Sequence, residues 1–344
     1  MSVTPSLHLP VLDFALLSGS ESERRVFLDS LSQAAREVGF FYLINHGIPQ
    51  SLLDEVQQVS RAFFALPQPD KQHVRMANSP HFRGYNLAGS EITRLQPDQR
   101  EQFDIGAERE ALPISEHAPV WQRLQGPNQW PAALPQLQPV LTEWQQEMTN
   151  VSLALLRAFA EALHLPRNAF DNLYGELPNE HVKLIRYPGQ PEEGPRQGVG
   201  AHKDSGFLSF LLQDNQPGLQ VEVTPGNWVD ASPLPGSFVV NIGELLELAT
   251  NGYLRATVHR VISPLPDQTR LSIAFFLGAE LGAIVPVYQL PESLARLALG
   301  PTSDPQNPLL RDVGWNYLKG RLRSHPDVAQ RFYADHLNTS TLQS

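Results

Sequence analysis

Cysteine is absent from all 344 residues of the chain. Disulfide bonds and thiolate metal ligands are therefore excluded, and the composition suits a reducing compartment such as the cytoplasm. Charged residues are scarce as well, at 18%, and acidic residues outnumber basic ones to give a formal net charge of −10. Because an excess of negative charge disfavours nucleic acid and anionic membranes as partners, we expect neither.

Long hydrophobic runs are also lacking. No stretch approaches the ~20 apolar residues of a transmembrane helix, and the first residues lack the basic and apolar regions of a secretory signal. We therefore expect a cytoplasmic protein. Hydrophobic residues still make up 41% of the chain, enough for a substantial core, and its 30 prolines favour short strands and structured loops.

Helical patterns occupy the N-terminal part and the middle of the chain. Ser20 and Glu23 form a capping box that predicts a helix ending near residue 38, and Pro49 predicts the start of a second helix. A buried strand is predicted over 39–44, between these helices. A long helix is predicted over 139–164, where apolar residues recur with helical spacing.

Short apolar strands separated by turns rich in proline and glycine begin near residue 182. Their regular spacing predicts an antiparallel sandwich or barrel, and with a metal site inside, the best match is a double-stranded β-helix, a jelly roll of the cupin type. The fold expected is mainly β with flanking helices. The predicted strands are 182–187, 207–213, 219–223, 227–230, 237–242, 254–262 and 270–277.

The chain divides by pattern into three segments that we expect to form one compact unit. Segment 1–135 is mixed α/β and ends in a stretch, 67–135, that we interpret as long loops and short helices because it shows little periodicity. Segment 136–290 holds the long helix and the jelly-roll core. Segment 291–344 returns to helix and is expected to pack on the core.

Candidate metal ligands are His202, Asp204 and the distant His259. Two imidazoles and one carboxylate are the ligand set of a mononuclear non-haem iron(II) site with open coordination positions. Side chains two residues apart point to the same side of a strand, so His202 and Asp204 are predicted to hold one metal from one strand. His259 would come from a second strand folded over the first.

Arg270 and Ser272 form a candidate carboxylate clamp beside this metal. They are also two residues apart on a predicted strand, so they share a face. A guanidinium group matches both oxygens of a carboxylate, and a hydroxyl group adds another hydrogen bond.

A second copy of the His-x-Asp spacing, His325-Pro326-Asp327, lacks this context. It is typical of a helix start, and His336, the histidine that follows it, is too near to come from a distant strand. We interpret His325 as a structural or solvent-exposed residue. His46, in a predicted turn, is likewise interpreted as structural.

Several motifs, in order along nearly the whole chain, resemble those of the isopenicillin N synthase-like family of iron(II)/2-oxoglutarate dioxygenases. They are Gly39 to Pro49 (GFFYLINHGIP), Ile185-Arg186-Tyr187-Pro188, the triad His202, Asp204 and His259, Asn241-Ile242-Gly243-Glu244, Asn251-Gly252-Tyr253, and Arg270-x-Ser272. The resemblance implies that the triad binds iron(II) and that 2-oxoglutarate chelates the metal. Its far carboxylate would reach Arg270 and Ser272, with Tyr187 nearby, and O2 would be the third reactant.

The resemblance further implies oxidation of a small-molecule substrate with release of succinate and CO2. Hydroxylation is the default outcome, with desaturation and ring formation also open. Two positions bear on the branch of the family. Ile185 stands where many plant members have Asn. Gln343, near the C-terminus, is either a metal-binding glutamine of the isopenicillin N synthase type or, as we favour, a tail residue without that role.

Five residues are candidate substrate contacts. Lys183 shares strand parity with Tyr187, so it is either a charge partner for an acidic substrate or co-substrate, or a rim lysine. Phe276 shares parity with Arg270 and Ser272 and belongs to the substrate pocket or to the core. The others lie where the family keeps substrate-contacting segments; they are Arg83, Tyr85 and Phe103.

Two other functions stay open from the sequence alone. An oxidative cyclase of the isopenicillin N synthase type would use iron(II) and O2 without 2-oxoglutarate, with Arg270 and Ser272 holding the substrate's own carboxylate. Succinate formation distinguishes the two enzymes. A non-catalytic jelly-roll binding protein with a structural metal is disfavoured, because structural sites normally close all coordination positions.

Overall fold

The computed structural model describes residues 8–336, apart from 94–95, 114, 116, 177, 192–195 and 303–306. An eight-stranded sheet forms the centre of the protein, in the order β1 (Val11–Asp13), β2 (Phe40–Ile44), β12 (Phe238–Ile242), β9 (Leu208–Gln213), β14 (Thr269–Gly278), β7 (Asn179–Pro188), β6 (Glu101–Gly106) and β3 (Gly84–Asn86). A four-stranded sheet contains β11 (Asn227–Asp230), β10 (Leu219–Thr224), β13 (His259–Ile262) and β8 (Gln197–His202). A small hairpin pairs β4 (Ile92–Thr93) with β5 (Gln96–Pro97). The predicted jelly-roll core with flanking helices is confirmed.

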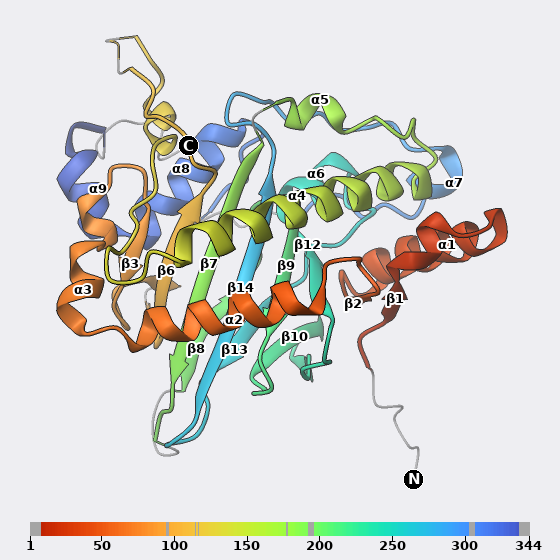
Figure 1. Ribbon diagram of the computed structural model, residues 1–344. Helices are drawn as coiled ribbons and strands as arrows, with labels where there is room; N and C mark the ends of the chain where they lie inside the picture. The colour runs from red at the N-terminus through yellow and green to blue at the C-terminus, as the bar shows by residue number, and fades with distance from the viewer. Residues whose placement is uncertain are drawn as a thin grey trace.

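Three helices cover the outer face of the large sheet (Figure 1). They are α1 (Glu21–Glu37), α2 (Gln50–Ala65) and α4 (Leu137–Ala162). Helix α1 opens with the predicted capping box, in which Ser20 and Glu23 satisfy each other's backbone N–H groups. It ends at Glu37, and Gly39, whose φ of +74° favours glycine, turns the chain into β2. The predicted helices and the strand between them are confirmed.

Strand β14 is buried on both faces, which explains its near-continuous apolar sequence. Leu271, Ile273 and Phe275 belong to the main core beneath the helices, where Phe275 meets the fully buried Trp144 edge-on at 6.2 Å. The alternate residues, including Ala274 and Phe276, face a second apolar cluster between the two sheets. The interior of the jelly roll therefore receives every second residue of β14, starting from Arg270.

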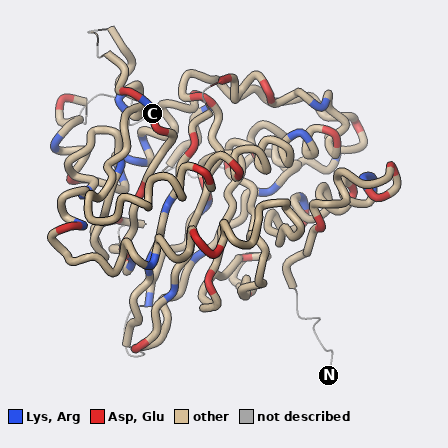
Figure 2. The backbone as a smooth tube through the Cα atoms, in the orientation of Figure 1, with Lys and Arg blue, Asp and Glu red and all other residues tan. Residues whose placement is uncertain are grey.

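The C-terminal helices α8 (Val313–Ser324) and α9 (Pro326–Phe332) pack as a pair against the segment that precedes α4. The shorter helices are α3 (Gln68–His73), α5 (Asp171–Tyr174), α6 (Glu244–Ala249) and α7 (Glu292–Ala295). Basic residues lie along the central strands as well as on the surface in Figure 2. Within the described parts of the chain, no helix combines the length and hydrophobicity needed to span a membrane.

Three predictions about strands were wrong in detail. Residues 67–135 contain β3 and β6, which extend the large sheet beyond β7. Their pattern was missed because β6 carries polar residues at its inward positions, including the fully buried Asp104. Only 259–262 of the strand predicted over 254–262 exists. Strand β8 is absent from the strands predicted by apolar pattern because its sequence QGVGAH has no apolar run, although His202 was expected to lie on a strand.

Candidate metal centre and substrate cavity

The three candidate metal ligands converge at the end of the small sheet where β8 ends and β13 begins. One ligand atom from each of His202, Asp204 and His259 lies within 4.8 Å of the other two. His202 ends β8 and His259 begins β13, and the two are directly paired across the sheet. Asp204 lies in the loop after β8, so the prediction that it shares a strand with His202 is wrong. The loop turns its carboxylate back to 3.6 Å from Nε2 of His202 and 3.8 Å from Nε2 of His259.

Hydrogen bonds fix which nitrogen of each imidazole faces this centre. Nδ1 of His202 lies 2.8 Å from the carbonyl oxygen of Gly200, and Nδ1 of His259 lies 3.2 Å from that of Thr257. Because a carbonyl oxygen can only accept, each Nδ1 carries the proton and donates. The unprotonated Nε2 of each ring is then the atom directed at Asp204, as in a metal-ligating histidine.

Asp204 is oriented in the same way through one of its two oxygens. Its Oδ2 accepts hydrogen bonds from Ser209 Oγ at 2.6 Å and from Asn241 Nδ2 at 2.8 Å, which leaves Oδ1 for the histidines. Burial opposes ionisation, but His259, His202 and the Ser209 hydroxyl together hold the pKa of Asp204 well below its usual range. Burial, with His202 nearby, lowers the pKa of His259 to about 4, so the imidazole is neutral.

The Asp204 loop is held in place by close backbone packing. The amide of Glu244 donates to the carbonyl oxygen of Asp204 at 2.8 Å. A Cβ on Gly243 would lie 2.2 Å from the carbonyl oxygen of Gly206, so a side chain at this position would push the loop away from α6. The Asn241-to-Glu244 motif therefore supports the metal ligand through both a side chain and a close approach.

This donor set fits a divalent transition metal. Two imidazole lone pairs and a carboxylate oxygen directed at one point repel one another unless a cation lies between them. Three protein ligands leave coordination positions open for other molecules, which is the arrangement of non-haem iron(II) oxygenases. Among the described residues, this is the group of histidine and acidic side chains that meets the spacing of a metal site.

Arg270 is a fully buried cation without an ion-pair partner among the described residues, although the charge of Asp214 acts on it from more than 4.0 Å away. Its Nη1 donates to Ser272 Oγ at 3.2 Å and its Nη2 to Gln213 Oε1 at 2.8 Å, while its Nε has no partner. Its guanidinium carbon lies 5.1 Å from the centre of the Tyr187 ring, which is on the adjacent strand. Within the described residues no carboxylate oxygen lies within 4.0 Å of it, and burial lowers the pKa of Arg270. A bound carboxylate would supply the missing charge, so the residues fit this part of 2-oxoglutarate.

A cavity of about 430 Å³ opens beside the metal ligands and includes His202 and Asp204 in its lining. Two of the five predicted substrate contacts, Lys183 and Phe276, line it. Both face the interior as their strand parity predicted. The hairpin that follows Glu91 and the helix α8 close its other sides.

The other three predicted contacts lie outside the lining. Tyr85 is in the core, and its hydroxyl group donates to Glu101 at 3.0 Å. Phe103 packs against Phe63 at 4.4 Å between ring centres. Arg83 is buried and donates to the carbonyl oxygens of His81 and Leu124. The direction of Tyr85 and Phe103 could not be predicted from alternation because their strands, β3 and β6, were not predicted, and Arg83 lies just before β3.

The two histidines interpreted as structural make protein contacts. His46 bonds to the backbone of Ile48 and Gly236. His325 is 1% exposed and precedes α9, as the helix-start pattern predicted. Its Nε2 lies 3.2 Å from Arg321 and 3.7 Å from Glu91. Of the two roles expected for His325, structural or solvent-exposed, the structure shows a buried side chain with protein contacts. Gln343 lies outside the described residues.

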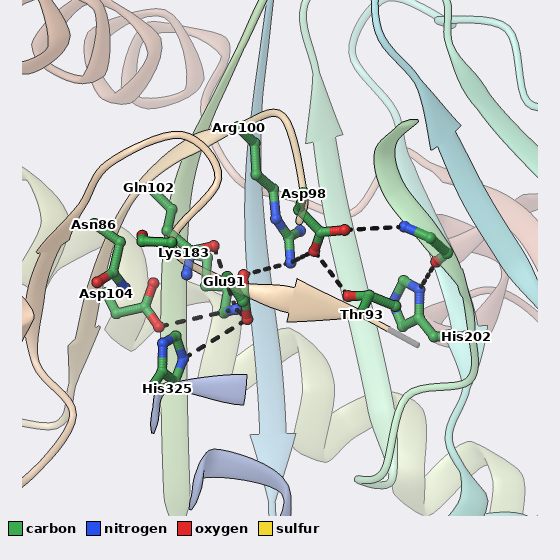
Figure 3. Close-up of polar contacts among 12 residues, drawn as sticks. Asn86, Glu91, Thr93, Asp98, Arg100, Gln102, Asp104, Lys183, His202 and His325 are labelled. Carbon is green, nitrogen blue, oxygen red and sulfur yellow. Dashed lines mark hydrogen bonds and ion pairs between the residues drawn. The ribbon is translucent and has the colours of Figure 1, made fainter. Parts of the chain in front are cut away.

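Sequence reasoning missed a cluster of charged side chains at the cavity (Figure 3). Its acidic members are Glu91, Asp98 and Asp104, and its basic members are Arg100, Lys183 and Arg321. Ser209, Asn241 and Gln213 were also missed as supporting residues. Asn241 lies in a motif that the sequence does show, whereas Glu91 and Arg100 lie in a region without periodicity.

Comparison with known proteins agrees with this geometry. Residues 9–133 match the family described as the N-terminal region of the non-haem dioxygenase in morphine synthesis, and residues 178–279 match the 2OG-Fe(II) oxygenase superfamily. The chain is 35% identical over 340 residues to the 2-oxoglutarate-dependent dioxygenase frbJ of Dothideomycetidae sp., with 94% of this chain and 91% of that protein covered. It is 35% identical over 265 residues to homoarginine-6-hydroxylase 2-ODD-C23.1 of Arabidopsis thaliana, covering 75% of this chain and 78% of that protein.

A solved structure shows the same likeness in three dimensions. A full-length Neurospora crassa protein, crystallised in complex with alpha-KG and thymine, superimposes with a TM-score of 0.74 at 25% identity, covering 97% of this chain and 98% of that one. The chain belongs to the 2-oxoglutarate- and iron(II)-dependent dioxygenase family. It is an oxidoreductase that uses iron(II), 2-oxoglutarate and O2 to oxidise a small molecule. This membership decides against the non-catalytic binding protein. It also favours the 2-oxoglutarate enzyme over the cyclase.

Proposed function

We propose that His202, Asp204 and His259 hold the catalytic iron(II), and that Arg270, Ser272 and Tyr187 receive the far carboxylate of 2-oxoglutarate. The observation that carries this proposal is the pairing of converging, unprotonated ligand atoms with a buried guanidinium that has no carboxylate oxygen within 4.0 Å in the described part of the chain. When bound, the iron couples the oxidative decarboxylation of 2-oxoglutarate by O2 to oxidation of a substrate C–H bond. Succinate and CO2 are released.

The residues of the chain bind and orient the reactants. Arg270 and Ser272 fix one end of the co-substrate, and their pairing with Tyr187 and Ile185 on β7 gives the clamp a rigid, two-strand support. Ser209 and Asn241 hold the Asp204 carboxylate with one oxygen free. The Nδ1 protons of the two histidines remain on the rings, where they are donated to backbone carbonyl oxygens, and take no part in proton transfer.

Apolar side chains give the cavity a surface that favours a C–H bond over water. Ile185, Val199 and Phe276 line it together with the metal ligands His202 and Asp204. Exclusion of water protects the reacting centre from side reactions. The apolar side chains hold the substrate's carbon skeleton next to the metal ligands. We propose hydroxylation as the reaction.

The substrate proposed is a small, charged molecule. A cavity of about 430 Å³ holds a molecule of metabolite size, and charged side chains form part of its lining. Relatives that are 32–35% identical are named homoarginine-6-hydroxylases, which suits a charged amino acid as substrate.

The test of this proposal is succinate formation by the iron-loaded protein. We expect conversion of 2-oxoglutarate to succinate that requires both iron(II) and O2, and we expect Asp204→Ala to abolish iron binding and turnover together. Iron content should be measured on the same samples. Unchanged turnover in Asp204→Ala would overturn the assignment of the triad.

A further inference from the structure

Four charged side chains from separate parts of the chain meet on the cavity lining. Glu91 precedes β4, Arg100 precedes β6, Lys183 lies on β7 and Arg321 lies on α8. The carboxylate of Glu91 is 2.5 Å from Nη2 of Arg100 and 3.1 Å from Nζ of Lys183. Figure 3 shows Glu91 between Arg100 on one side and Lys183 and His325 on the other. Glu91 is thus the acidic side chain at this part of the lining, which we call the Glu91 pole.

Positive charge is in surplus around Arg321, which we call the Arg321 pole. Arg321 donates to Asp104 Oδ2 at 3.0 Å, while its Nε has no hydrogen-bond partner. Arg83 lies close enough to Arg321 for the two cations to repel, is 4% exposed, and has no carboxylate oxygen within 4.0 Å among the described residues. The two guanidinium groups therefore share the Asp104 carboxylate, and Glu91 also acts on Arg321.

The two poles are close together. Nε2 of His325 lies 3.2 Å from Arg321 and 3.7 Å from Glu91, so a single imidazole spans them. Lys183 also contacts both sides, at 3.1 Å from Glu91 and 3.9 Å from Asp104. A ligand that engages both poles must therefore carry its two charges close together.

Burial makes this cluster selective for the total charge pattern of a ligand. The side chains of Glu91, Lys183 and Arg321 are 10% exposed or less. A ligand with one charge that drew Glu91 or Arg321 from its partner would leave that partner buried without a counter-ion, which is strongly unfavourable. A ligand with both charges releases cations and a carboxylate together, and these can pair with one another: Lys183 already lies 3.9 Å from Asp104, and Arg100 keeps Asp98 at 3.3 Å.

We propose that the substrate is a zwitterion of the α-amino acid type, whose ammonium group binds Glu91 and whose carboxylate binds Arg321. This inference rests on the oxygenase function proposed for the cavity. The metal ligands His202 and Asp204 line the same cavity, so the side chain of the amino acid extends toward them. Oxidation then occurs on the side chain, not at the carbon that carries the two charged groups.

The first test uses the wild-type enzyme with iron(II) and 2-oxoglutarate. The proteinogenic L-amino acids and L-homoarginine are screened for succinate formation above the rate without them, and the best is compared with the amine that lacks its carboxylate and the acid that lacks its amino group. We expect each analogue to lose at least ~100-fold in kcat/KM, because a buried polar group left unpaired rejects the analogue strongly. An analogue within ~3-fold of the amino acid, or a screen without any stimulation, would overturn the inference.

Two variants assign the charges to their poles. Glu91→Gln should shrink the discrimination against the analogue that lacks the amino group, and Arg321→Gln that against the analogue that lacks the carboxylate. Glu292→Gln on α7, whose side chain is 79% exposed, is the matched control and should keep both preferences. If each variant affected both analogues equally, the assignment of the poles would be wrong.

The outcome for this inference is separable from that for the proposed function. Succinate formed slowly from 2-oxoglutarate without any amino acid reports the iron and co-substrate sites alone, and it also shows that each variant is folded. Its absence in the wild-type enzyme would contradict the proposed function. Its presence, without stimulation by an amino acid, would contradict only the zwitterion. The comparison of analogues needs no variant, so it decides even where a substitution prevents folding.

Discussion

Replacing Arg270 with Met should weaken 2-oxoglutarate binding severely without destabilising the protein in the absence of ligand. Arg270 is fully buried, and the hydrogen bonds it makes go to neutral partners, Ser272 and Gln213. Most buried cations here have an acidic neighbour, as Arg100 has in Glu91. We therefore expect the guanidinium of Arg270 to pair with a negative charge on a bound ligand. Met fills a similar space without the charge.

The expected magnitude follows from the burial of that charge. Removing one partner of a buried, hydrogen-bonded charge pair costs ~2–5 kcal/mol, which weakens binding of 2-oxoglutarate by about 30- to 5,000-fold. In the free protein, two hydrogen bonds worth ~1 kcal/mol each are lost. Relief of an uncompensated buried charge offsets that loss, as when apolar residues replace buried ions. The free energy of unfolding without ligand should therefore stay within ~1 kcal/mol of wild type or rise.

Two measurements and one control decide the matter. The dissociation constant for 2-oxoglutarate is measured anaerobically on the iron-loaded protein, and the free energy of unfolding is measured by denaturant on the ligand-free protein. Arg24→Met is the control, because Arg24 is partly buried against Glu161 on the helical layer, remote from the clamp. It should leave 2-oxoglutarate binding unchanged. Unchanged binding in Arg270→Met, together with a loss of more than ~3 kcal/mol in stability, would refute the reasoning.

Three further outcomes are expected. Asn241→Ala should weaken iron binding ~10- to 100-fold by freeing the Asp204 carboxylate; a competition titration with a metal chelator measures this, and unaltered affinity would contradict the supporting role. Burial lowers the pKa of His325 to about 3, so the unfolded state, where the pKa is ~6.5, takes up the proton first and stability is lost as pH falls below ~6.5. Between about pH 8 and pH 5, the free energy of unfolding of His325→Gln, measured in urea, should therefore fall by ~2 kcal/mol less than that of wild type. An equal fall in both proteins would show that His325 is not the source of the pH dependence. Trp144→Ala should lower the free energy of unfolding by ~3–5 kcal/mol through a cavity in the main core, and a loss below ~1 kcal/mol would show that the site collapses.

The parts of the site that the sequence revealed are those where polar residues interrupt apolar strands. Arg270 and Ser272 stand out on β14 because its other residues are almost all hydrophobic, and period-two alternation then places them inside the jelly roll. The same parity placed Lys183 and Phe276 on the cavity lining. His259 was found on similar grounds, although its strand begins only at that residue.

The parts that the sequence did not reveal depend on long-range packing. Strand β6 has polar residues on its cavity side, so the alternation of polar and apolar residues was hidden. The directions of Phe103 on β6 and of Tyr85 on the neighbouring β3 could therefore not be predicted. Glu91 and Arg100 reach the cavity because the β4–β5 hairpin packs between β8 and α8. No local sequence pattern indicates these long-range contacts. The candidate ligand Asp204 lies in a loop, where its position is set by the approach of Gly243 and not by strand geometry.

The most direct test of the central assignment is an anaerobic visible-absorption titration of the iron(II)-loaded protein with 2-oxoglutarate. The assignment of His202, Asp204 and His259 to iron and of Arg270 to the co-substrate predicts a new, weak charge-transfer band that saturates with 2-oxoglutarate. The band should be missing in Asp204→Ala and should need far more 2-oxoglutarate in Arg270→Met. If iron binding is confirmed and no band appears in the wild-type protein, the co-substrate does not chelate this metal and the central assignment is wrong.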